Sequence, residues 1–244
     1  MSGKIITVWG GNNSGKSTFA VNLACALSNC NRLVGLISSN LTYGNLQIFF
    51  CQSISPEKGL FHALHEDNPN IGEKFSEYEE SKNLFFLSVP THYTGLLCDT
   101  VTLQNVERMI TAASLVFDIL IIDGAGELTN PVSGAGLWMA EKIYTLHKPS
   151  IAAQMWHQGV VDFVQELHIG GKQIHILRAP NGDFDDKTYQ SITELSFAYE
   201  LPFVKRASEL ENAGTPIYFF RDRACRRYIR ALEKISGEIC GGKA

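Results

Sequence analysis

The sequence predicts an α/β fold, with a doubly wound, mostly parallel sheet and helices on both of its faces. Two observations carry this prediction. Short, mainly apolar runs alternate with segments of helical periodicity, and the first run ends in a glycine-rich turn. Uninterrupted apolar runs are typical of strands that are buried on both faces, as in parallel sheets. Strands and helices that alternate in this way form right-handed βαβ units.

The first strand and helix are the most clearly marked elements. Ile5–Trp9 is apolar and ends at Gly10 and Gly11, and Ser17–Ser28 then carries an apolar helical stripe. Further strands are predicted at Leu33–Ile37, Leu84–Val89, Phe117–Ile122, Lys142–Leu146 and Gln173–Leu177. Further helices are predicted at Gly59–His65, Asn105–Ser114, near Gly159–Leu167, at Tyr189–Tyr199 and from about Asp222 to Ile239. The acidic segment Glu66–Glu80 is predicted to be an exposed connection or an irregular helix.

Composition bounds the class of protein. The chain has 244 residues, of which 45% are hydrophobic and 19% charged, and its formal net charge is −4. Because domains run to about 100–200 residues, we expect a single domain over residues 1–244. The apolar fraction excludes a disordered chain. The mild acidity argues against a protein coated in nucleic acid, although it leaves room for a local basic patch.

The cellular setting predicted by the sequence is the cytoplasm. The 6 cysteines form no CxxC pair, and most of them lie within apolar runs, which favours a reducing environment. No segment approaches the roughly 18–20 apolar residues that a membrane-spanning helix needs. The first residues are predicted to form a strand rather than a signal peptide, because no small-residue cleavage site follows them.

A phosphate-binding loop is the strongest motif. Residues 10–17 read GGNNSGKS, which fits G-x-x-x-x-G-K-S/T between a buried strand and an amphipathic helix. In such a loop the backbone N–H groups form an anion nest at the positive end of the helix. Lys16 would reach the β- and γ-phosphates, and the Ser17 hydroxyl would be a Mg²⁺ ligand. The predicted nucleotide-binding residues are Gly11, Asn12, Asn13, Ser14, Gly15, Lys16, Ser17 and Thr18.

A second acid for the metal follows the most apolar strand. Asp123 ends the run Phe117–Ile122, and an acid at the carboxyl end of a buried strand lies on the ligand edge of an α/β sheet. It would hold Mg²⁺ through water, as Walker-B acids do. The predicted metal site therefore consists of Ser17 and Asp123. The turn Gly124–Gly126 that follows is flexible enough to sense a γ-phosphate.

With these two motifs in place, nearly the whole chain resembles the MinD/ParA family of P-loop ATPases. Within that family it is most similar to the pilus-assembly and secretion branch, the CpaE/TadZ type. The segments that carry the resemblance are Lys4–Val8, Thr18–Ala24, Leu36–Leu46, Phe117–Gly126, Leu201–Phe203 and Gly214–Pro216. The resemblance implies ATP and Mg²⁺ as ligands, a homodimer that encloses the ATP, and protein partners in a larger assembly.

The phosphate loop diverges from that family's pattern. The family reads K-G-G-x-G-K-S/T, and its first lysine reaches the nucleotide of the partner subunit. In this chain that lysine falls on Gly11, and the two glycines fall on Asn12 and Asn13. The charge that would cross the dimer is therefore absent. The family's base-reading asparagine falls near Arg178, which puts the recognition of adenine in doubt.

The switch segment after the second predicted strand diverges as well. Ser38 and Asn40 stand where the family has two aspartates, the second of which positions the attacking water. Asn40 can order a water by hydrogen bonding, but it cannot accept a proton or supply charge to the metal. The resemblance thus implies Lys16, Asn40 and Asp123 as the catalytic set. Because these changes affect ATP hydrolysis more than nucleotide binding, we expect an ATPase with weak turnover or none.

Three functions remain in view. The first is an atypical ATP-binding protein that acts as a nucleotide-dependent dimer and localises or regulates a pilus or secretion machine. The second is a DNA-partition ATPase that binds DNA without base specificity. The third is a P-loop small-molecule kinase or ligase, which would need a substrate-binding insertion with acids or arginine clamps. No such insertion is evident in the sequence.

The last predicted helix bears on the second function. Its apolar face, Cys225, Tyr228, Ile229, Leu232 and Ile235, is the predicted docking face. Its other face is basic, and Arg223, Arg226, Arg227 and Arg230 could bind DNA phosphates. A solvated basic face is the commoner explanation. After this helix, residues 241–244 have no apolar face, so we expect no membrane-binding tail of the MinD type.

Overall fold

The computed structural model describes residues 2–65, 70–91, 101–179 and 185–241. All its strands lie in one sheet, in the order β3-β4-β2-β5-β1-β6-β7-β8. The strands are β1 (Lys4–Gly10), β2 (Val34–Ser38), β3 (Ser76–Tyr78), β4 (Ser81–Leu87), β5 (Ile119–Asp123), β6 (Lys142–His147), β7 (Gln173–Arg178) and β8 (Tyr199–Leu201). Neighbours are parallel except for the β3–β4 pair, which is antiparallel. The predicted doubly wound, mostly parallel α/β fold is confirmed.

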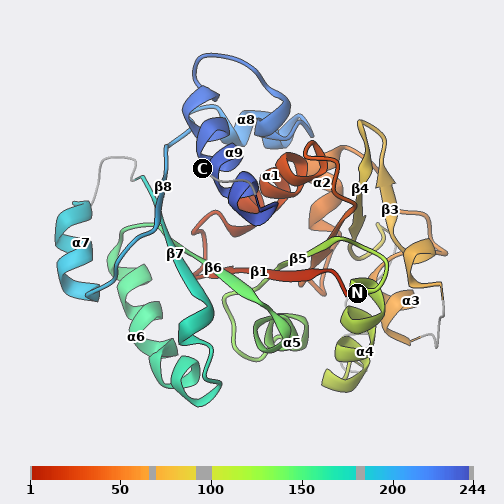
Figure 1. The fold of residues 1–244 in the computed structure, drawn as a ribbon, viewed down its shortest axis with the longest axis horizontal. Coiled ribbons are helices and arrows are strands. Elements are labelled where there is room, and N and C mark those ends of the chain that lie inside the picture. The colour runs from red at the N-terminus through yellow and green to blue at the C-terminus, as the bar shows by residue number, and fades with distance from the viewer. Residues whose placement is uncertain (1, 66–69, 92–100, 180–184, 242–244) are drawn as a thin grey trace.

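Helices cover both faces of this sheet (Figure 1). One face carries α1 (Lys16–Ser28), α2 (Asn45–Phe50), α8 (Ala207–Asn212) and α9 (Arg226–Ile239). The other carries α4 (Leu103–Ser114), α5 (Pro131–Met139) and α6 (Ile151–Glu166), whereas α3 (Leu60–His65) lies beside α4 and α7 (Asp186–Thr193) lies beyond β7. In the part of the chain that the structure describes, no helix is both long and apolar enough to cross a membrane.

The helix α1 is enclosed by its neighbours. All ten residues from Phe19 to Ser28 are buried, so α1 contacts protein on every side. It packs on the sheet below and against α9, whose apolar residues join the same core cluster. The predicted docking face of α9 is confirmed, because Cys225, Tyr228, Ile229, Leu232 and Ile235 are all buried. Burying this apolar surface fixes the helix that begins at the phosphate loop.

The bounds of some predicted helices differ in the structure. The helix predicted at Tyr189–Tyr199 ends at Thr193, and Tyr199 starts the strand β8. Glu194 ends α7 in the left-handed conformation with φ 54°, and the Ala198 amide then donates to the carbonyl of His175 in β7. The helix predicted near Gly159–Leu167 is longer at its start, because α6 begins at Ile151.

The segment Glu66–Glu80, predicted as an exposed connection or an irregular helix, includes a short irregular helix in its described part, but it also contains a strand and buried residues. Ile71–Lys74 is a 3₁₀ helix and Ser76–Tyr78 is the edge strand β3. Ile71 and Phe75 are buried in the core beneath α4, so this stretch covers one end of the sheet. Its few apolar residues are interspersed with charges, which hides the strand from a search for apolar runs. Residues 66–69 lie outside the described part.

Candidate functional site

Three adjacent strands bring the predicted motifs to one edge of the sheet. β1 lies between β5 and β6, and its Val8 is in register with Asp123 at the end of β5. Ser38, the last residue of β2, is also in register with Asp123. From β1 the chain passes over α1 to β2, on the far side of β5. Ligands of open α/β sheets bind at such carboxyl edges, where the strand order reverses.

The phosphate loop connects β1 to α1 through two residues of positive φ. Asn13 has φ 59° and Gly15 has φ 92°, and α1 begins at Lys16. A side chain at Gly15 would be strained by that backbone and would also meet Arg178, whose Nη1 lies 3.2 Å from the position of a Cβ there. The Lys16 ammonium donates to the Gly11 carbonyl at 2.8 Å. Burial lowers the pKa of Lys16, an effect that the charges of Asp123 and Glu127 oppose.

Asp123 is a buried carboxylate with one oxygen to spare. Its Oδ2 accepts from Asn45 Nδ2 at 3.4 Å, and the Ser17 side chain is near enough to lower its pKa. Burial raises the pKa of Asp123 to about 6, against the opposing effects of Ser17, Lys16 and Asn45. Oδ1 has no hydrogen-bond partner among the described residues. A buried acceptor without a partner needs an explanation.

These residues fit a magnesium ion. Mg²⁺ prefers oxygen ligands and is usually held by one or two protein groups together with substrate phosphates and water. The Ser17 hydroxyl and the unpaired Oδ1 of Asp123 supply oxygen donors of that kind side by side. The donor set is therefore the one that a phosphate-bound magnesium would use.

Hydrogen bonds within the switch segment hold its conformation. Asn40 Oδ1 accepts from the backbone N–H groups of Thr42 and Tyr43, at 2.9 and 3.1 Å. Ser38 Oγ donates to Asn45 Oδ1 at 2.6 Å and accepts from the Asn40 amide. The predicted Asn40 thus lies at the site, but its side-chain oxygen forms a turn in its own loop.

A cavity of about 590 Å³ joins these groups. Five of the predicted site residues line it, namely Asn12, Lys16, Ser17, Asn40 and Asp123. Gly11, Asn13, Ser14 and Gly15 form the loop behind it. Ser14 Oγ is buried there without a partner among the described residues. The structure does not bring the Thr18 hydroxyl to this cavity, because it donates to Glu211 of α8 at 2.5 Å.

Sequence reasoning missed several residues at the site. Asn45, Glu127 and Asn130 line the cavity, and Asn130 also donates to the Ser39 carbonyl at 2.8 Å. Trp156 of α6 donates through Nε1 to the Gly126 carbonyl at 3.1 Å. Asn45 lies within the segment that resembles the MinD/ParA family, which is a signal that could have identified it. Trp156 has no such signal, because only the fold brings α6 to this edge.

Arg178, which falls at the family's base-reading position, also lies against the loop. Its Nη1 donates to the Asn13 carbonyl at 3.4 Å. It borders a small cleft with Gly15, Thr18 and Pro202 rather than the larger cavity. A guanidinium carries only donors, so it cannot replace the acceptor of an asparagine amide.

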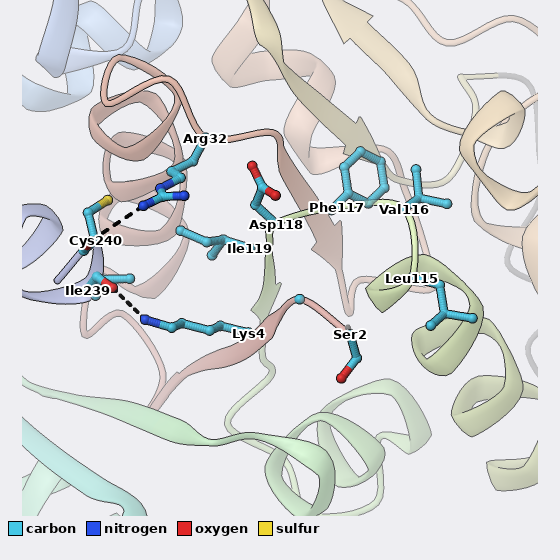
Figure 2. A pocket seen from close by; sticks show the side chains of 11 residues that line it. Ser2, Lys4, Arg32, Leu115, Val116, Phe117, Asp118, Ile119, Ile239 and Cys240 are labelled. Carbon is cyan, nitrogen blue, oxygen red and sulfur yellow. Dashed lines mark hydrogen bonds between the residues drawn. The ribbon is translucent and has the colours of Figure 1, made fainter.

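A second cavity, of about 290 Å³, lies where the first strand begins (Figure 2). Lys4 donates to the Ile239 carbonyl at 2.7 Å, and Arg32 to the Cys240 carbonyl at 3.5 Å. The other charged group there, Asp118, accepts from the Leu33 amide at 2.9 Å. The charged side chains of this cavity therefore hold the end of α9 and the start of β2.

The basic residues of the last helix are exposed to solvent. Arg226, Arg227 and Arg230 lie on the outer side of α9, opposite its buried apolar face, and Arg223 is exposed in the turn before the helix, which begins at Arg226 rather than near Asp222 as predicted. Arg221 pairs with Glu233 at 3.6 Å across the same surface. The arginine stripe predicted from the sequence is thus available to a partner.

A phosphate loop at the end of the first strand of such a sheet, facing a buried strand-end aspartate, defines the P-loop NTPase fold. Comparison with solved structures narrows the fold further. MinD of Aquifex aeolicus superposes with a TM-score of 0.78 at 14% identity, covering 99% of this chain and 98% of that one. A ParA family ATPase of Chlorobium tepidum gives 0.79 at 15% identity, with 96% and 98% covered.

Two further similar structures were determined with bound nucleotide. MinD of Pyrococcus horikoshii, complexed with Mg-ADP, gives a TM-score of 0.77 at 18% identity, with 97% of this chain and 95% of that one covered. A plasmid partition protein of Borrelia burgdorferi bound to AMPPNP gives 0.74 at 18% identity, with 97% and 99% covered. The chain therefore has the fold of the MinD/ParA ATPases. No family model matches its sequence, and no curated protein does.

Proposed function

We propose that this chain is an atypical MinD/ParA-like ATP-binding protein that turns over ATP slowly or not at all. The observation that carries the proposal is the unpaired, buried Oδ1 of Asp123, beside Ser17 and within the electrostatic reach of Lys16. A carboxylate is stable in such a place when it faces a cation. Magnesium with a nucleoside triphosphate supplies that cation.

Different groups around the cavity would bind the phosphates and the magnesium ion. Lys16 would exchange the Gly11 carbonyl for phosphate oxygens, which are stronger acceptors because they are charged. The loop amides and the start of α1 would bind the remaining phosphate charge. Ser17 would ligate the magnesium directly, and Asp123 through water. Magnesium, when bound, neutralises part of the charge that develops on the phosphates.

Hydrolysis is expected to be slow because two groups are missing. Gly11 stands where a lysine would place a positive charge on the γ-phosphate of the partner subunit. The Asn40 amide cannot take a proton, and its oxygen already accepts two backbone N–H groups. Removing one preorganised group of this kind typically costs ~10²–10³ in rate. Nucleotide that is bound and retained can still hold a dimer together.

The proposed role is to place or regulate a pilus or secretion machine from the cytoplasm, as a homodimer. Support comes from the sequence resemblance to that branch and from the shared fold. One structure with this fold is a MinC:MinD cell division complex of Aquifex aeolicus, with a TM-score of 0.76 at 13% identity. We transfer from it only the expectation of a protein partner. Genes for such a machine beside the gene of this chain would support the assignment.

Three measurements on the purified protein test the proposal together. Calorimetry with ATP and Mg²⁺ should give binding, gel filtration with ATP should give a larger species, and a phosphate-release assay should give little product. Rapid release with no change in size would contradict the switching role. Absence of ATP binding would contradict the site itself.

The exposed arginines of α9 and of the turn before it favour DNA as an alternative partner. Four phosphate contacts, from Arg223, Arg226, Arg227 and Arg230, would give a salt slope of about −3 to −4, since each contributes about −0.9. Filter binding of random duplex DNA with ATP, repeated over a range of salt, measures that slope. Reversing two charges, as in Arg226→Glu with Arg230→Glu, should abolish this binding. Binding that is unchanged in the variant would exclude this surface.

A further inference from the structure

The loop after β5 places a second carboxylate at the nucleotide cavity. Glu127 follows Gly126 and lines the same cavity as Lys16, Ser17 and Asp123. It is exposed to solvent at this edge, and its charge is felt by the Lys16 ammonium. A lysine of a phosphate loop marks the side of the cavity where the β- and γ-phosphates lie. Glu127 therefore lies toward the phosphate end of the cavity.

The lining of this cavity contains two carboxylates with different surroundings. Asp123 is buried at the end of its strand, accepts a hydrogen bond from Asn45, lies near Ser17, and is suited to the metal. Glu127 lies further along the loop, where the cavity is exposed to solvent. A side chain that orients the attacking water is a recurring part of P-loop NTPase sites. In the switch segment the corresponding places are taken by Ser38 and Asn40, which carry no carboxylate.

The backbone beside Glu127 is held from both directions. The Ala125 amide donates to Ser133 Oγ at 2.6 Å, and the Gly126 carbonyl accepts from Trp156 Nε1 at 3.1 Å. Gly126 also approaches the phosphate loop so closely that a Cβ there would lie 2.9 Å from the Gly10 carbonyl oxygen. These contacts fix the direction in which the chain enters Glu127.

Trp156 contacts both loops of the site. Besides its hydrogen bond to Gly126, its ring lies over Gly11, where a Cβ would come within 3.2 Å of Trp156 Cγ. The ring meets Trp9, at the end of β1, edge to face, with 4.8 Å between the ring centroids. Trp156 is therefore fixed against the rigid base of the phosphate loop while it holds the loop that carries Glu127.

We propose that Glu127 orients the attacking water in the turnover that this site retains, and that Trp156 is its positioning residue. The proposal rests on the ATP-binding function proposed above. The water oxygen bonds to the γ-phosphorus, and the bond from that phosphorus to the β–γ bridging oxygen breaks, leaving its electron pair on the ADP. One proton of the water stays on the released phosphate, and the other passes through the Glu127 carboxylate to solvent.

The test compares Glu127→Gln and Glu127→Ala with Glu141→Gln, a matched change of an exposed glutamate at the start of β6. Single-turnover phosphate release should fall ~10²-fold in both Glu127 variants, which is the usual contribution of one acid–base group. Their affinity for ADP with aluminium fluoride, a mimic of the transferring phosphoryl group, should weaken with the rate. Their affinity for ATPγS should stay within about twofold, because ground-state binding does not use a water-orienting group. Glu141→Gln should change none of these.

The outcomes separate this inference from the proposed function. Equal affinity of wild type and Glu127→Gln for ADP with aluminium fluoride would overturn the role of Glu127, as would a wild type with no turnover. ATPγS binding in either case leaves the ATP-binding function standing. Failure of the wild type to bind ATPγS would overturn that function first.

Trp156→Phe tests the positioning role, because it keeps a ring and removes the N–H donor. Turnover should fall ~10-fold with ATPγS affinity unchanged, since a loosened loop costs transition-state contacts alone. Tryptophan emission should also respond to ADP with aluminium fluoride in wild type and in the control Trp138→Phe, but not in Trp156→Phe. An unchanged rate and an unchanged emission response in Trp156→Phe would overturn this role.

Discussion

The two ends of the central strands carry similar charged residues and use them differently. At the amino ends, Lys4 and Arg32 donate to the last carbonyls of α9, and Asp118 accepts from a backbone amide (Figure 2). At the carboxyl ends, Lys16 also donates to a carbonyl, but Asp123 keeps a buried oxygen without a partner among the described residues. The two ends therefore differ in their aspartates and not in their lysines: Asp118 has a main-chain partner, whereas one oxygen of Asp123 has none among the described residues.

This difference shows how a binding site can be told from a structural cluster. A charged group whose bonding capacity is met by nearby main chain stabilises the fold and gains little from a ligand. A buried acceptor that is left over costs free energy until a ligand arrives. The unpartnered oxygen of Asp123 thus lowers the free energy of unfolding of the protein without ligand, and the binding of magnesium and nucleotide would offset that cost.

The largest effect is expected from Lys16→Ala set against Lys4→Ala. Loss of two charge-assisted bonds to phosphate, worth about 1.5–3 kcal/mol each, should weaken ATP ~10³-fold while leaving the thermal midpoint near that of wild type. Lys4→Ala should do the reverse, with ATP affinity unchanged and unfolding easier by about 1–2 kcal/mol. Calorimetry and chemical denaturation of both variants measure these effects. Similar ATP affinity for wild type and Lys16→Ala would refute the site.

The next effect is on the pH dependence of stability, measured without Mg²⁺ or nucleotide. Because the pKa of Asp123 is raised in the folded state to about 6, its protonated form stabilises the fold below pH 4, and that contribution is lost as pH rises through 6. Asparagine does not ionise, so the stability of Asp123→Asn should not fall over this pH range. At pH 7 its free energy of unfolding should exceed that of wild type by up to about 3 kcal/mol. The two proteins should converge near pH 4. Parallel curves from pH 4 to 8 would contradict the burial of this carboxylate.

The response of Asp123→Ala to metal should be smaller. Residues that act on a metal through an intervening group typically cost 10–100-fold, so we expect ATP to weaken ~30-fold in Mg²⁺. In EDTA the loss should be no more than about twofold. Titrations with a fluorescent ATP analogue in both buffers give the ratio. An equal loss in the two buffers would remove Asp123 from the metal site.

The smallest effects belong to the amino end. Asp118→Ala leaves the Leu33 amide without its acceptor and should cost about 1 kcal/mol of unfolding free energy. Arg32→Ala removes a long, exposed bond and should cost less than about 0.5 kcal/mol. Denaturant titrations resolve the first change and bound the second. A change in ATP affinity in either variant would show that the two ends are coupled.

The sequence predicted those parts of the site that lie in local patterns. The phosphate loop and Asp123 each follow an apolar strand, so their place on the ligand edge can be read from spacing. Trp156 and Glu127 have no such pattern, because their places beside the phosphate loop and at the cavity depend on how β5, β6 and α6 pack. The bond between Thr18 and Glu211 joins residues 193 positions apart in the sequence, and no local signal foretells it.

The same reasoning explains the errors in the fold. The periodicity of Tyr189–Tyr199 does not mark where the helix ends and the strand begins. The segment mixes polar and apolar residues, and β8 has three residues only. The short strand β3 was missed for the same reason. Long buried strands such as β5 leave no such ambiguity, since all five of its residues are buried.

The enclosure of α1 sets a limit on how this protein can move. With every residue from Phe19 to Ser28 buried, the amides of this helix can meet solvent deuterium only when the whole molecule opens. The loop that would bind phosphate is therefore joined to a helix whose amides should be among the last to exchange with deuterium. Any fluctuation that admits or releases a nucleotide must come from the switch segment or the loop after β5, while the amide nest between β1 and α1 keeps its shape.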